Sequence, residues 1–66
     1  ISDAATAAWM AMASIQSAAL NVRVNAAGLQ DTAQKEAWLA ELDAIIARAQ
    51  VLLAEVQAVV AQRAGI

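Results

Sequence analysis

The sequence predicts an all-α fold, an antiparallel two-helix hairpin with helices over residues 3–27 and 32–64 that packs into a larger helical assembly. The chain has 66 residues, of which 62% are hydrophobic, and it contains no Pro, Phe or Tyr. It is rich in alanine, the strongest helix former. Its apolar residues recur at steps of three and four on both sides of a single internal glycine, Gly28.

The first helix is expected to begin around Ser2 or Asp3, where a cap and a negative charge meet the positive end of the helix dipole. One seam of heptad type runs along it. Most of its members are alanine, so the seam is thin. These members are Ala5, Ala8, Met12, Ile15, Ala19, Val22 and Ala26.

Residues 25–31 read as the turn. Gly28 suits the left-handed position just past a helix C-terminus, which places Leu29 where a Schellman motif brings an apolar residue onto Val24. Asp31 then reads as the N-cap of the next helix, with Gln34 three residues on, as in a capping box. The second helix is expected to end near Arg63, before Gly65.

The second helix is apolar on two opposite sides. Large residues repeat every seven positions in two adjacent columns, Trp38, Ile45, Leu52, Val59 and Leu39, Ile46, Leu53, Val60, with Leu42, Ala49 and Val56 between them. The far side carries Ala40, Ala44, Ala47, Val51, Ala54, Ala58 and Ala61. A helix that is apolar nearly all round is buried on more than one side.

Folding the hairpin about residues 28–30 divides these side chains into two sets. The predicted hairpin core comprises Met12, Ile15, Leu20, Val22, Trp38, Leu42, Ile45 and Leu52. The longer second helix then projects beyond the first from about Glu55. The candidate intermolecular interface comprises Trp9, Leu53, Val56, Val59 and Val60. We expect residues 1–66 to form a single hairpin domain.

The residue types argue against catalysis. There is no Cys and no His, which removes disulfides, thiolate nucleophiles and the common zinc and iron sites. The only lysine, Lys35, has no Ser at helical spacing, and Glu41, Asp43 and Glu55 read as a solvated surface. We therefore expect no enzyme, with no catalytic, metal or cofactor-binding residues and no cofactor.

The net charge and the polar residues limit the kinds of partner that the chain is expected to bind. A net charge of −2 with well-separated cations argues against nucleic acid. The uncharged run Ala4–Val22 approaches a membrane span in length, but its polar side chains and small apolar residues argue against insertion. No small-molecule substrate is expected. The predicted partners are copies of the chain itself or a larger protein scaffold.

These observations predict a structural subunit, such as a filament subunit or a small component of a virus particle. The alternatives are an adaptor or regulatory module that forms a four-helix bundle, and a membrane-associated pilin-like subunit or membrane-active peptide. The column Glu41, Arg48, Glu55, Gln62 repeats every seven residues beside the apolar stripe. It reads either as a solvated flank or as charges that set partner orientation.

Overall fold

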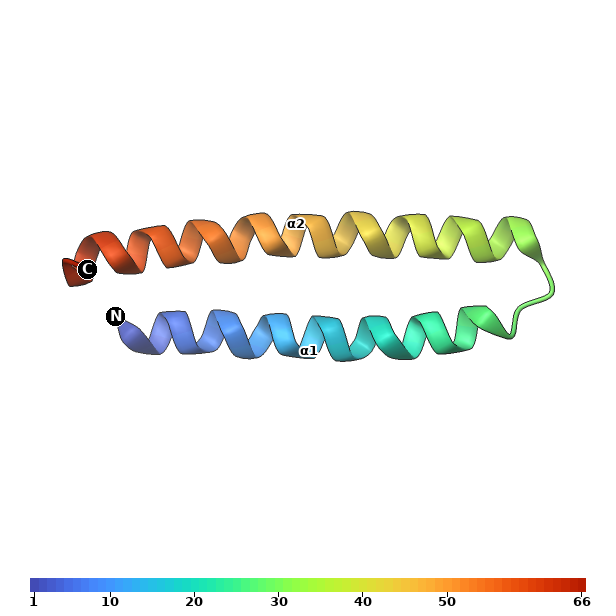
Figure 1. The fold of residues 1–66 in the computed structure, drawn as a ribbon, viewed down its shortest axis with the longest axis horizontal. Helices are drawn as coiled ribbons and strands as arrows, with labels where there is room; N and C mark the ends of the chain where they lie inside the picture. The colour runs from blue at the N-terminus through green and yellow to red at the C-terminus, as the bar shows by residue number, and fades with distance from the viewer.

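The computed structural model is an antiparallel pair of helices, α1 over Ser2–Ala27 and α2 over Thr32–Ala64 (Figure 1). It describes all 66 residues, and the molecule measures 52 × 15 × 11 Å. The two chain termini lie at the same end, opposite the turn (Figure 1). The predicted all-α hairpin is confirmed.

Asp31 caps the start of α2. It lies in extended conformation, and its Oδ1 accepts a hydrogen bond from the backbone N–H of Gln34 at 3.0 Å. This bond satisfies one of the donors that the first turn of a helix leaves free. At the other end, Arg63 lies in the last turn, where a positive charge complements the helix dipole.

Gly28 differs in conformation from what the sequence predicts. Gly28 has φ −86° and ψ −4°, which is right-handed, and the N–H of Leu29 bonds to the carbonyl of Ala26 at 3.0 Å. The last turn of α1 therefore tightens without a left-handed residue. Gly65 takes the left-handed position instead, with φ 72° and ψ 31°. The N–H of Ile66 there reaches the carbonyl of Ala61 at 2.9 Å, which forms the Schellman motif.

The contact between the helices is built from alanine on α1 and larger residues on α2. Ala5, Ala19 and Ala26 are buried in α1, and Ile46 and Val60 are buried in α2. Small side chains let the α1 backbone approach α2 closely, so the larger residues of α2 fill the space between them. The apolar positions that are partly buried are Ala8, Met12, Ile15, Leu29, Leu39, Leu42, Ala49, Leu53, Val56 and Ala61.

Only one of the two large columns of α2 faces α1. The buried or partly buried column is Leu39, Ile46, Leu53 and Val60. The adjacent column of Trp38, Ile45, Leu52 and Val59 is exposed, because a single partner helix covers a stripe too narrow for both. Of the predicted core, Met12, Ile15 and Leu42 lie in the contact, whereas Leu20, Val22, Trp38, Ile45 and Leu52 are exposed.

The structure also differs from the prediction that α2 projects beyond α1 from about Glu55. Ile1 and Ala4 share a surface hollow with Val56 and Val59, so the first turn of α1 reaches these residues. The linking residues are 28–31, as predicted, so the difference lies in how far α1 reaches along α2. Of the predicted intermolecular residues, Leu53, Val56 and Val60 therefore pack towards α1, while Trp9 and Val59 are exposed.

By length and composition, α2 could cross a membrane. The run singled out from the sequence, Ala4–Val22, lies in α1 and does not meet the same criterion. Core helices of other proteins meet that criterion as well, so the property by itself is weak evidence.

Candidate functional site: an apolar trough along the hairpin

One side of the hairpin carries a ridge of large exposed apolar side chains from α2. Trp38, Ile45, Leu52 and Val59 are each 44–52% exposed and stand seven residues apart. On α1, Ala4, Ile15 and Val22 border the hollows on the same side. The ridge and these α1 residues bound a trough between the two helices, which we call the apolar trough.

Three hollows follow this trough. The hollow near the turn has a volume of about 190 Å³ and is lined by Val22, Trp38, Glu41, Leu42 and Ile45. The central hollow measures about 450 Å³ and is lined by Ile15, Glu41, Ala44, Ile45, Arg48, Ala49 and Leu52. The third measures about 430 Å³ and is lined by Ile1, Ala4, Glu55, Val56, Val59 and Arg63. Glu41 and Ile45 line both of the first two hollows, which are therefore adjacent.

Charged side chains of alternating sign border the trough. Glu41, Arg48 and Glu55 follow each other at seven-residue spacing, and Arg63 lies beyond them. The column that the sequence offered as a solvated flank or as partner-orienting charges therefore lines the hollows, except for Gln62. The trough combines apolar walls with a carboxylate and a guanidinium at its edge.

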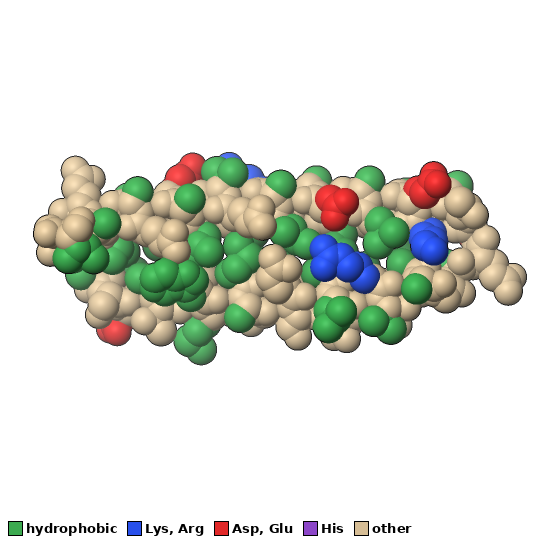
Figure 2. Space-filling view, viewed as in Figure 1, with side chains coloured by type: hydrophobic (Ala, Val, Ile, Leu, Met, Phe, Trp, Pro, Cys, Tyr) green, Lys and Arg blue, Asp and Glu red, His purple; other side chains and the backbone are tan.

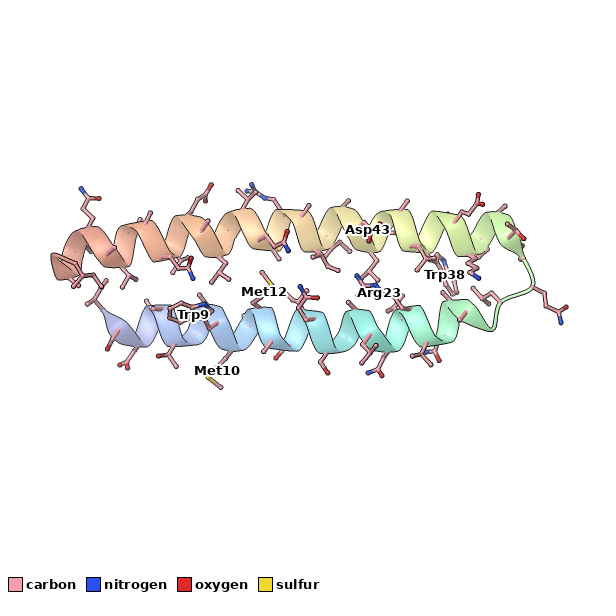
Figure 3. All side chains as sticks on the ribbon, viewed as in Figure 1. Trp9, Met10, Met12, Arg23, Trp38 and Asp43 are labelled. Atoms are coloured by element: carbon pink, nitrogen blue, oxygen red, sulfur yellow. The ribbon has the colours of Figure 1, made fainter.

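A different side of the hairpin carries several charged groups between the helices (Figure 2). Arg23 extends from α1 towards α2, on the side where Asp43 lies (Figure 3). Trp9 is on this side as well and is 54% exposed, while Met10 points away from α2 (Figure 3). Trp9 and Trp38, the only aromatic residues, therefore belong to different surfaces of the hairpin.

The chemistry that these residues offer is recognition. No group of three or more His, Cys, Asp or Glu side chains comes together to hold a metal ion. Every carboxylate is exposed, and no polar side chain is buried. What the chain presents to a ligand is an apolar surface with ionic groups at its edge, the composition of many small-molecule sites.

Two comparisons with known proteins bear on this surface. The family model described as formiminotransferase-cyclodeaminase matches residues 1–44, two thirds of the chain. The chain is also 52% identical over 52 residues to a methenyltetrahydrofolate cyclohydrolase of Methylorubrum extorquens. That match covers 79% of this chain and 25% of the relative, so the hairpin spans about a quarter of the relative's length. No solved structure matches.

These matches overturn the function predicted from the sequence. The structural subunit, with its filament and virus-particle roles, is wrong, because the family and the relative are both named for enzymes. The adaptor and pilin-like alternatives are corrected on the same ground. The exclusion of an enzyme rested on the missing His and Cys. It treated 66 residues as the whole source of catalytic groups, whereas the matched relative is about four times as long as the match.

The predicted partners are corrected too. The prediction that the chain binds only proteins and no small molecule is wrong, because the relative is named for a reaction of methenyltetrahydrofolate. No residue motif in the sequence indicated a small-molecule ligand, and the charged column beside Trp38 was interpreted only as a solvated or partner-selecting flank. The match over residues 1–44 includes the whole of α1, the turn and Trp38 and Glu41 of α2. The chain belongs to the formiminotransferase-cyclodeaminase family.

Proposed function

We propose that this chain is a helical hairpin of an enzyme that hydrolyses methenyltetrahydrofolate, and that the apolar trough forms one wall of its folate site. The observation that carries this proposal is the 52% identity to a methenyltetrahydrofolate cyclohydrolase over 79% of the chain. Identity at this level favours a common reaction as well as a common fold. In this proposal residues 1–66 act as one hairpin unit.

The trough suits the apolar parts of a folate. A cyclohydrolase adds water to open a ring, and a folate presents a flat pteridine and a benzoyl ring beside that ring. Such groups are held by apolar and aromatic side chains with a few polar groups that set orientation. Trp38, Ile45 and Leu52 provide the apolar surface, and Glu41 and Arg48 provide the polar groups.

The remaining apolar surfaces suit contact with other helices of a larger enzyme. Met10, Leu20 and Val24 of α1 are 60–66% exposed, and Val51 of α2 is 49% exposed. Exposed apolar groups in this number are typical of a surface that is covered in the complete protein. The strongly apolar α2 is then a bundle helix, which accounts for its hydropathy without a membrane.

A chimeric enzyme tests this function. The 52 matched residues of the Methylorubrum extorquens cyclohydrolase are replaced by the corresponding residues of this chain. We expect the chimera to hydrolyse methenyltetrahydrofolate, followed by the loss of the substrate's near-ultraviolet absorbance. The matched control carries a hairpin of the same composition, in which the apolar residues are shuffled among the apolar positions and the polar residues among the polar positions. A chimera that folds but is as inactive as this control contradicts the proposal.

A further inference from the structure

We infer that the apolar trough binds the folate lengthwise, with the pteridine end against Trp38 and Glu41 and the glutamate carboxylates at Arg48. This inference rests on the proposed function and assigns the ends of the substrate to named residues. Two adjacent hollows carry it, because an aromatic side chain, a carboxylate and a guanidinium follow one another along them.

The hollow near the turn has the features that a pteridine requires. Trp38 lines it and is 45% exposed, so part of its indole is available for stacking with a flat ring. Glu41 lines the same hollow and supplies a carboxylate. A pteridine edge presents N–H donors, and the methenyl bridge gives the ring system a positive charge. A carboxylate accepts charge-assisted hydrogen bonds from the N–H edge and is attracted by the positive charge of the ring system.

The central hollow suits the benzoyl part of the ligand. Ile45 lines both hollows, and Ile15 and Leu52 continue the apolar surface. Its volume of about 450 Å³ falls in the range of small-molecule sites. A second aromatic ring therefore has an apolar surface to lie on, directly after the pteridine position.

Arg48 sets the direction of the ligand. It follows Glu41 by seven residues, which is two helical turns or about 10 Å along α2. A guanidinium binds a carboxylate through two parallel hydrogen bonds, so Arg48 suits the glutamate end of a folate. The reverse orientation would place the glutamate carboxylates against Glu41, where like charges repel.

Binding to the chimeric Methylorubrum extorquens enzyme that carries this hairpin tests the assignment, with folic acid and the methyl ester of pteroic acid as probes. The ester has the pteridine and benzoyl rings but carries neither the glutamate nor a free carboxylate. We expect Glu41→Gln to weaken the binding of both probes by about tenfold, the effect of one charge-assisted hydrogen bond. Arg48→Met is expected to weaken the binding of folic acid by a similar factor and to leave the binding of the ester unchanged. Isothermal titration calorimetry measures all four affinities.

Matched controls lie outside the trough lining. Asp43→Asn and Arg23→Met remove the same charges from residues that line none of the hollows, and we expect both to leave either affinity unchanged. Circular dichroism checks that each variant keeps its helix.

Three results would overturn the assignment. They are an unchanged affinity for folic acid in Arg48→Met, an equal loss of affinity for both probes in Arg48→Met, and an equal effect of the control variants. If the chimera nevertheless hydrolyses methenyltetrahydrofolate, the proposed function stands and only the location of the ligand is wrong.

Discussion

Ile45 and Ile46 are adjacent in the sequence and lie in opposite environments: Ile46 is 8% exposed in the contact with α1, and Ile45 is 52% exposed in the apolar trough. One residue of an α-helix turns the side chain by about 100°, which suffices to move it from one surface to the other. The same relation holds for Leu53 and Leu52. The hairpin thus has one column for stability and an adjacent one for the trough.

This division predicts unequal effects of truncation in α2. Ile46→Ala should lower the free energy of unfolding by about 2 kcal/mol, because it leaves a cavity between the helices. Ile45→Ala should change it by less than about 0.5 kcal/mol, because the side chain is already exposed and alanine favours the helix. Thermal unfolding followed by circular dichroism measures both. Equal losses would mean that both columns stabilise the hairpin.

The cap of α2 gives a second prediction. Asp31→Ala removes the acceptor of the 3.0 Å bond from the Gln34 N–H and should cost about 1 kcal/mol of stability. Asp31→Asn keeps a side-chain oxygen at the same place and should retain most of the stability. Urea unfolding of the three proteins tests this. A cap that contributes nothing would leave all three midpoints equal.

The two glycines should respond oppositely to alanine. Gly28 has right-handed angles, and a Cβ there would meet the Asn25 carbonyl oxygen at 3.6 Å, an ordinary contact. Gly28→Ala should therefore stabilise the hairpin by about 0.5 kcal/mol through the unfolded state. Gly65 has φ 72°, so Gly65→Ala should cost about 1 kcal/mol, measured as fraying of the last turn by amide exchange. Destabilisation by Gly28→Ala would indicate a left-handed turn.

Close packing of the alanines in α1 gives a further prediction. Ala19 is fully buried against α2, so Ala19→Leu should cost about 1–3 kcal/mol by forcing the helices apart. Ala13→Leu, at an exposed position of the same helix, should be nearly neutral. Unfolding midpoints of the two variants give the comparison. A neutral Ala19→Leu would show that the helices are not in close contact there.

The fold could be predicted from the sequence because its signals are local. Alanine content, the apolar spacing and the Asp31 cap each act within a few residues and agree with one another. The choice between adjacent columns could not be predicted. Trp38 and Leu39 are both large and apolar, and periodicity alone does not say which of the two faces a single partner helix.

The candidate site could be predicted only in part. The spacing of Glu41, Arg48 and Glu55 showed a column of alternating charge beside the apolar stripe. Its role as the edge of a trough depends on Ala4, Ile15 and Val22 of the facing helix, which are brought opposite it only by folding. The enzyme family could not be read from residue chemistry, because the chain carries no His or Cys and spans a quarter of its relative.

The most direct test is the rate of methenyltetrahydrofolate hydrolysis by the chimeric Methylorubrum extorquens enzyme that carries this hairpin. A hairpin that comes from an enzyme with the same reaction should give the chimera a kcat/KM within about tenfold of the parent enzyme. A tenfold change corresponds to about 1.4 kcal/mol of transition-state stabilisation. A kcat/KM as low as that of the shuffled-hairpin control, in a chimera with the parent's helix content and solubility, would contradict it.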